Sequence, residues 1–152
     1  MLSLLQSNYD QFKTIAESQS LATEFITPTV FIGIATDIKI IGDVLTRLFD
    51  NALKFTHQGS IILRLVLSAD EKDAIISVED TGIGIPEGNL EKIFTEFSHL
   101  QENVSGVESG AGIGLNIARK ELALLQGTIS VNSKVDQGTC FIITLPRRQN
   151  IE

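Results

Sequence analysis

Two glycine-rich segments, about thirty residues apart, constrain this chain more than any other feature. The first, Asp80-Thr-Gly-Ile-Gly-Ile-Pro86, follows a strand-like run, and the second, Gly110-Ala-Gly-Ile-Gly-Leu115, precedes a helical one. Glycine lets the backbone approach a ligand closely, and the amide groups at the start of a helix attract anions. Their order along one small domain predicts a site for an anionic ligand.

Composition narrows the class of protein. The 152 residues, 43% of them hydrophobic, suit one globular domain. The net charge of −7 argues against nucleic acid or an anionic membrane surface as the main partner, because both require a basic surface. No apolar run approaches the roughly 20 residues that span a bilayer. The chain lacks the basic start of a signal peptide, and its lone Cys140 predicts a reduced, buried thiol. We therefore expect a cytoplasmic module.

Hydrophobic spacing divides the chain into helices and strands. Helical spacing predicts helices over 3–18, 37–56 and 113–125, with Asp37 capping the second and Gly127 ending the third. Strands are expected at 22–26, 30–34, 60–67, 74–79, 128–131 and 139–145, and one short helix near 90–94. The pattern predicts an α+β two-layer sandwich, a mixed and mostly antiparallel sheet covered on one face by about three helices. The first helix should bury Leu5, Tyr9, Phe12, Ile15 and Ala16.

The second helix carries a polar edge. Arg47, Asn51 and Lys54 lie four and seven residues apart, so they project from one side. An asparagine oxygen is a ligand for Mg²⁺, and a lysine offers a point charge to phosphate. The structural alternative is a solvated helix face.

Asp80 ends a strand on the same side as Ile76 and Val78, so its carboxylate should face the core. A carboxylate there is costly unless it is paired. A turn-forming Asp-Thr-Gly with a carboxylate in solvent is the alternative. Thr139 shares its strand face with Phe141 and, taken alone, reads as an ordinary strand threonine.

The order of these three segments resembles the ATP-binding catalytic domain of two-component sensor histidine kinases. That family belongs to the GHKL superfamily, which also holds gyrase, mismatch-repair ATPases and ninety-kilodalton heat-shock chaperones. The resemblance runs from about Leu4 to Pro146 and implies the Bergerat fold for a single domain over 1–152. It also implies a linker-proximal helix at 1–18, an ATP lid at 98–109, and a dimerisation and phosphoacceptor domain outside this chain.

The same resemblance implies roles for individual residues. Asp80 would accept a hydrogen bond from the exocyclic amine of adenine, Asn51 would bind Mg²⁺, and Lys54 would contact a phosphate. Phe94 and Phe97 resemble a phenylalanine box that anchors the lid, although both could simply be core. The other expected ATP-binding residues are Gly82, Gly84, Ile85, Gly110, Gly112, Ile113, Gly114, Leu115 and Thr139.

Three features depart from the family pattern. Arg47 stands where gyrase-like hydrolases have a glutamate that activates water, and a guanidinium cannot act as that base. Two interpretations stay open: Arg47 pairs with Asp43 or Asp50, or it intrudes on the Mg²⁺ position. The lid contains no Lys or Arg, which predicts a slack lid or weak ATP binding. Neither His57 nor His99 lies in a phosphoacceptor-like context.

The resemblance implies a protein histidine kinase. The domain would bind Mg·ATP and present the terminal phosphate to a histidine on a separate helical bundle of the parent kinase. A response-regulator receiver domain would be an indirect partner, with no nucleic acid and no direct membrane contact, although the parent protein could be membrane-anchored. We expect a monomer in isolation. Two alternatives stay open: a degenerate, non-catalytic domain used for regulation or docking, and a serine kinase of the anti-sigma-factor type.

Overall fold

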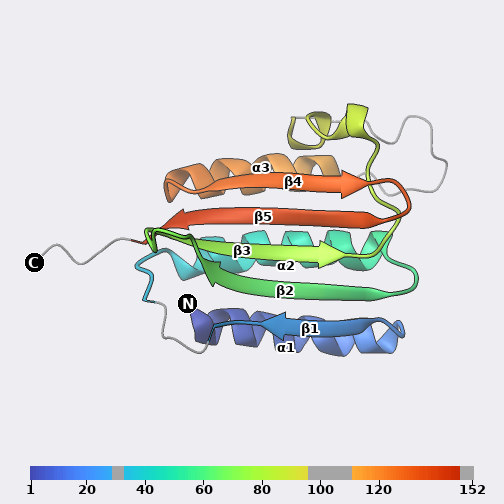
Figure 1. Cartoon of the computed structure of the whole chain (residues 1–152), viewed down its shortest axis with the longest axis horizontal. Helices are drawn as coiled ribbons and strands as arrows, with labels where there is room; N and C mark the ends of the chain where they lie inside the picture. Colours follow the sequence, from blue (N-terminus) through green and yellow to red (C-terminus); the bar gives the residue numbers. More distant parts are fainter. Residues whose placement is uncertain (29–32, 96–110, 148–152) are drawn as a thin grey trace, which may run out of the picture.

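The computed structural model describes residues 1–28, 33–95 and 111–147. In this part of the chain, three α-helices lie on one face of a five-stranded sheet, as predicted (Figure 1). The helices are α1 (Leu2–Ser18), α2 (Ile38–Phe55) and α3 (Ala111–Leu124), and two short 3₁₀ turns are η1 (Glu87–Asn89) and η2 (Lys92–Phe94). The strands are β1 (Ala22–Ile26), β2 (Ser60–Leu67), β3 (Asp73–Asp80), β4 (Thr128–Lys134) and β5 (Gly138–Pro146).

The sheet has the strand order β1-β2-β3-β5-β4. The pair β1–β2 is parallel and the other three pairs are antiparallel, which confirms the mixed, mostly antiparallel sheet. In this register Asp80 at the end of β3 stands opposite Thr139 at the start of β5. Alternate residues of a strand face opposite sides, so both share the helix-covered side with Val78 and Phe141.

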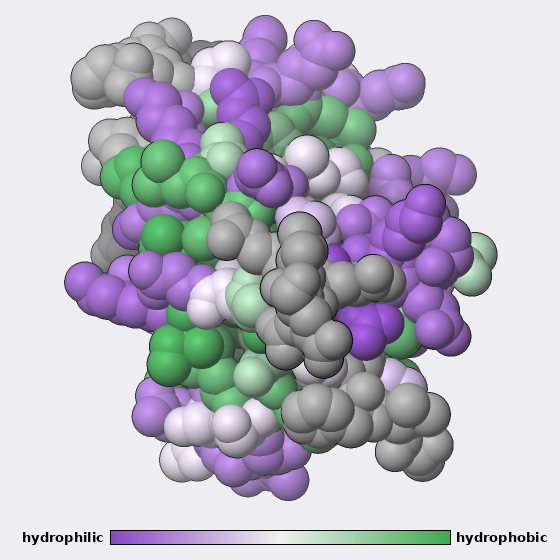
Figure 2. Space-filling view, turned by 90° about the vertical axis from the view of Figure 1, so that its left-hand side faces the viewer, coloured by the Kyte–Doolittle hydropathy of each residue, from purple (hydrophilic) through white to green (hydrophobic). Residues whose placement is uncertain are grey.

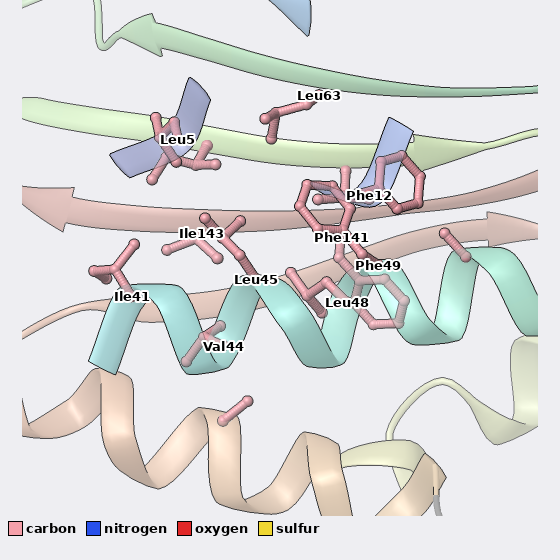
Figure 3. Packing of buried hydrophobic residues seen from close by; sticks show 14 of the residues in the cluster. Leu5, Phe12, Ile41, Val44, Leu45, Leu48, Phe49, Leu63, Phe141 and Ile143 are labelled. Carbon is pink, nitrogen blue, oxygen red and sulfur yellow. The ribbon is translucent and has the colours of Figure 1, made fainter. Parts of the chain in front are cut away.

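Helix α2 is the central helix of the covering layer. Asp37 caps it as predicted, because its carboxylate accepts hydrogen bonds from the amides of Lys39 and Ile40. Figure 3 shows side chains from α2, including Leu45 and Phe49, packed toward the strands, and Val44 on the side that faces α3. The buried face of α2 comprises Ile41, Val44, Leu45, Leu48, Phe49 and Ala52.

Helix α1 packs beside α2. Leu5, Tyr9, Phe12 and Ala16 are buried as predicted, and the Phe12 ring stacks on a ring of α2 with centroids 4.2 Å apart. Ile15 was expected in this stripe but is 49% exposed. The four buried residues are spaced by four, three and four, and a residue one position before Ala16 lies off that stripe.

Several element boundaries differ from the prediction. The strand expected at 30–34 falls mostly on residues 29–32, outside the described part, and Gly33 and Ile34 are not in a strand. The short helix expected near 90–94 is a pair of 3₁₀ turns. At the end of α3, Gln126 rather than Gly127 adopts the left-handed conformation, with φ of 59°. Gly127 is needed for space, because a Cβ there would lie 2.7 Å from Leu145 Cδ2.

The open side of the sheet and the end remote from Asp80 carry scattered apolar residues. Figure 2 shows that end, where hydrophobic groups lie among hydrophilic ones. Cys140 is half-buried on the open side rather than fully buried, and partial burial and then Glu79 raise the pKa of its thiol. No helix in the described ranges is long and apolar enough to cross a membrane.

Candidate functional site

The carboxylate of Asp80 points into the protein at the end of β3. Asp80 is 6% exposed, and its Oδ1 accepts a 2.9 Å hydrogen bond from the amide of Gly82. Burial raises the pKa of this carboxyl group, and the backbone amides of Gly82 and Thr139 lower it by less. The Asp80 carboxylate therefore faces the core, as strand parity predicted. The alternative, a turn with this carboxylate in solvent, is not observed.

Two threonines border this carboxylate. Thr139 is 7% exposed and lies directly opposite Asp80 in the β3–β5 register. Thr56, the residue after α2, is 2% exposed and lies close enough to Asp80 to lower its pKa. Its hydroxyl oxygen has no well-formed hydrogen bond to any described residue. The hydroxyl lies near the Asp80 carboxylate and still has acceptor lone pairs, so this corner can bind a polar ligand atom or water.

The first glycine box is fixed by the protein's own backbone. A Cβ at Gly82 would collide with the carbonyl oxygen of Phe55, and a Cβ at Gly84 would collide with that of Lys134. Gly84 also has a positive φ of 71°, a conformation that glycine adopts at no cost. These glycines were expected to let the backbone approach a ligand. In the structure they let other backbone segments of the chain approach the first glycine box. This approach brings the end of α2, the first box and the β4–β5 turn into contact.

The polar edge of α2 lies beside this box. Asn51 and Lys54 are half-buried, and the Lys54 ammonium lies 5.8 Å from the centre of the Phe55 ring. The amide of Ile83 donates a 3.1 Å hydrogen bond to the Phe55 carbonyl, so α2 is joined to the first box directly. The predicted metal and phosphate ligands are therefore held in a fixed relation to Asp80.

Arg47 has a different partner from either one expected. It reaches across to α3, where its Nη2 lies 3.8 Å from Oε1 of Glu121, instead of pairing with Asp43 or Asp50 within α2. Partial burial raises the pKa of Asp50. The interpretation that Arg47 pairs within its own helix was wrong, because a long side chain on the α3 side of α2 can reach a neighbouring helix.

The second glycine box is described only in part. Gly110 lies outside the described residues, as do Phe97, His99 and the whole of the expected lid at 98–109. The backbone at Gly112 and Ile113 belongs to the first turn of α3. Gly114 is half-buried, and Leu115 is 3% exposed within the core, so its side chain serves packing. His57 is exposed.

Phe94 belongs to the hydrophobic core. It is 7% exposed and meets Phe141 edge-on with ring centroids 6.3 Å apart. The guanidinium of Arg119 on α3 lies 5.9 Å from the centre of the same ring. The core interpretation of Phe94 is confirmed, and its role as a lid anchor stays a prediction.

A cavity of about 700 Å³ opens at the Asp80 end of the sheet. Three predicted site residues, Asp80, Ile85 and Thr139, line it together with η1 and the β4–β5 turn. Glu79 and Cys140 also line it, so the cavity extends to the open side of the sheet. Asn51 and Lys54 do not line it. No group of three His, Cys, Asp or Glu side chains in the described ranges could hold a metal unaided. A metal bound by Asn51 would therefore need further ligands from a bound molecule, which suits Mg²⁺ with phosphates.

Sequence reasoning missed Ser133, which organises the wall of this cavity. Its hydroxyl oxygen accepts a 2.8 Å hydrogen bond from the amide of Ile85 and lies 2.8 Å from the Thr139 hydroxyl and from the Gly138 carbonyl. Gly138 was missed as well, although its φ of 122° and the collision of a Cβ with the Asp80 carbonyl require glycine. The signal in the sequence was the connection between the strands expected at 128–131 and 139–145, which placed both residues close to Thr139.

The chain is similar to known proteins across this whole region. A family model described as histidine kinase-, DNA gyrase B-, and HSP90-like ATPase matches residues 36–149. The adaptive-response sensory kinase SasA of Crocosphaera subtropica is 35% identical over 137 residues, which cover 90% of this chain and 35% of SasA. The chain thus spans about a third of the length of that relative.

Solved structures share its fold. The nucleotide-free catalytic domain of histidine kinase ThkA matches with a TM-score of 0.80 and 26% identity, covering 95% of this chain and 92% of that domain. Full-length ShkA in complex with AMPPNP matches with a TM-score of 0.81 and 25% identity, covering 95% of this chain and 29% of ShkA. The match to ThkA extends over almost the whole of one catalytic domain.

Proposed function

The chain belongs to the family of histidine kinase-, DNA gyrase B- and HSP90-like ATPases, and from this premise we propose that it binds Mg·ATP as the catalytic domain of a sensor histidine kinase. The terminal phosphate is transferred to a histidine on a separate helical-bundle domain. A kinase-type transferase agrees with the relatives, which are sensory histidine kinases several times longer than the matched region.

The buried carboxylate of Asp80 is the observation that carries this proposal. A carboxylate whose pKa is raised by burial gains from an additional hydrogen-bond donor. The exocyclic amine of adenine is such a donor, whereas guanine presents a carbonyl oxygen at that position. The hydroxyl of Thr56 beside the same carboxylate supplies a second polar atom for the base or for a bridging water. Asp80 is also among the residues that line the cavity at this end of the sheet.

The edge of α2 and the start of α3 hold the phosphates in this proposal. Asn51 would bind Mg²⁺, and Lys54 and the amides of the first turn of α3 would neutralise phosphate charge. When bound, Mg²⁺ would stabilise the charge that develops on the transferring phosphate. The protein's part is to orient the phosphates toward the acceptor, since no residue of the site is the nucleophile.

Titration calorimetry with ATP and GTP tests the adenine assignment. We expect ATP to bind and GTP to bind at least about tenfold more weakly, because an unpaired polar group in the site penalises the wrong base. Asp80→Asn should weaken ATP binding by about tenfold or more. Asp73→Asn, at the other end of the same strand, should leave it unchanged. Equal affinity of Asp80→Asn and the unchanged protein for ATP would contradict the assignment.

Transfer of labelled phosphate from ATP to a separately supplied histidine-bearing bundle tests the reaction. Labelled bundle supports the kinase, whereas ATP binding without any transfer supports the degenerate, regulatory alternative. Transfer to serine on a partner protein supports the anti-sigma-factor type. The contact of Arg47 with Glu121 directs its guanidinium toward α3, which favours the kinase over the degenerate alternative.

A further inference from the structure

Arg47 spans the junction between α2 and α3, one helical turn before Asn51. Val44, three residues earlier, lies on the side of α2 that faces α3 (Figure 3), and residues three apart share a helix side. The Cδ of Arg47 lies 3.9 Å from the position that a Cβ at Gly114 would take. Its guanidinium reaches Glu121, two turns further along α3. Arg47 therefore lies along α3 from the second glycine box to Glu121.

The Arg47–Glu121 pair is incompletely formed. The two side chains are 33% and 24% exposed, and their one contact, Nη2 to Oε1, measures 3.8 Å. The Nε of Arg47 and the Oε2 of Glu121 are both buried without a hydrogen-bond partner among the described residues. Partly buried charges lose hydration, which a single long contact does not recover. A guanidinium and a carboxylate can form two parallel hydrogen bonds, and Nε and Oε2 are the donor and the acceptor left for such an arrangement.

We propose that Arg47 is a positioning residue that, together with Glu121, aligns the start of α3 with Asn51 and Lys54 for phosphate binding. The unmatched donor and acceptor come together when the first turn of α3 engages the phosphates, because Glu121 and the phosphate-binding amides belong to the same rigid helix. The free energy gained when Arg47 and Glu121 complete their ion pair then strengthens the binding of phosphates and leaves the binding of the base unchanged. This inference rests on the proposed function.

Parallel NMR titrations with ATP and with adenosine test it. In Arg47→Met we expect the Kd for ATP to rise about tenfold, within the range for residues that act through a neighbouring element. The Kd for adenosine should change by less than about twofold, because adenosine reaches only the Asp80 end. Arg147→Met is the control, since it removes an arginine that donates a 3.0 Å hydrogen bond to the Glu71 carbonyl at the end of the sheet remote from Asp80. Both affinities should be unchanged in this control.

A double-variant cycle shows whether Arg47 acts through Glu121. Glu121→Gln alone should weaken ATP binding as Arg47→Met does, and the double variant should lose no more than either single variant. Additive losses, a parallel loss of adenosine affinity, or unchanged ATP affinity would each overturn the inference. If Arg47→Met does not fold, as judged by circular dichroism, Glu121→Gln with the same two ligands decides the question. Failure of the unchanged protein to bind ATP would instead count against the proposed function.

Discussion

The amide of Ile83 donates a hydrogen bond to the carbonyl oxygen of Phe55, and this contact joins the first glycine box to the end of α2. The two segments come this close only because Gly82 has no side chain. The contact fixes the distance between Asp80, which we assign to the base, and Asn51, which we assign to the metal. The geometry of the proposed site is therefore set by backbone packing between these elements.

Gly82→Ala should disturb this junction. Its Cβ would collide with the Phe55 carbonyl, so either the hydrogen bond from Ile83 breaks or α2 moves. We expect a loss of about 1–3 kcal/mol in the free energy of unfolding, as for other overpacked positions, and weaker ATP binding. Gly88→Ala is the matched control, because nothing lies within 4 Å of its Cβ position. Urea unfolding curves with equal midpoints for the two variants would refute this account of the junction.

Ser133→Ala should loosen the wall of the cavity. The substitution leaves the Ile85 amide without its 2.8 Å acceptor in a partly buried place. Such a loss costs about 1–3 kcal/mol, and it should also weaken ATP binding because Ile85 lines the cavity. Ser130→Ala, on the exposed side of the same strand, should change stability by less than about 0.5 kcal/mol. Thermal unfolding and calorimetric titration of both variants measure these effects.

The fold could be predicted because its determinants are local in the sequence. Alternation in β2, β3 and β5 identified the buried face of the sheet, and helical spacing identified the buried face of α2. Strand parity alone placed the Asp80 carboxylate inside. The predicted ends of helices were less accurate, because hydrogen bonds of the last turn determine where a helix ends. At the end of α3, Gln126 adopts the left-handed conformation that was expected of Gly127.

The remainder of the site depends on contacts between segments far apart in the chain. Glu121, the partner of Arg47, lies on another helix, so no spacing rule within α2 could identify it. Ser133 gained its role from the register between β4 and β5, which places it opposite Thr139. The glycines of the first box were expected to make room for a ligand, but Gly82 and Gly84 make room for backbone carbonyls. A single sequence does not reveal whether a ligand or another segment of the chain occupies the space beside a glycine.

Asp80→Asn should stabilise the fold at neutral pH while it weakens ATP binding. Burial raises the pKa of Asp80 more than its amide partners lower it. A carboxyl group with a raised pKa stabilises the folded state fully only below its unfolded pKa, and this contribution is lost as pH rises through the folded value. Asparagine removes the buried charge and keeps an oxygen for the Gly82 amide. We expect a gain of about 1 kcal/mol at neutral pH, typical of relieving a destabilising group in a binding site.

The pH dependence of this gain separates buried charge from other causes. Because a raised pKa means that Asp80 takes up its proton at a higher pH than an ordinary aspartate, the advantage of Asp80→Asn should shrink as pH falls from neutral toward 3.8, the ordinary value for aspartate. Asp70→Asn gives the opposite comparison, since a hydrogen bond from Ser68 lowers the pKa of exposed Asp70. There the unchanged protein should be the more stable one at neutral pH, and its advantage should shrink in acid. Urea unfolding of all three proteins across this range measures both trends. An Asp80→Asn variant less stable than the unchanged protein at neutral pH would mean that the amide hydrogen bonds outweigh the burial of the charge.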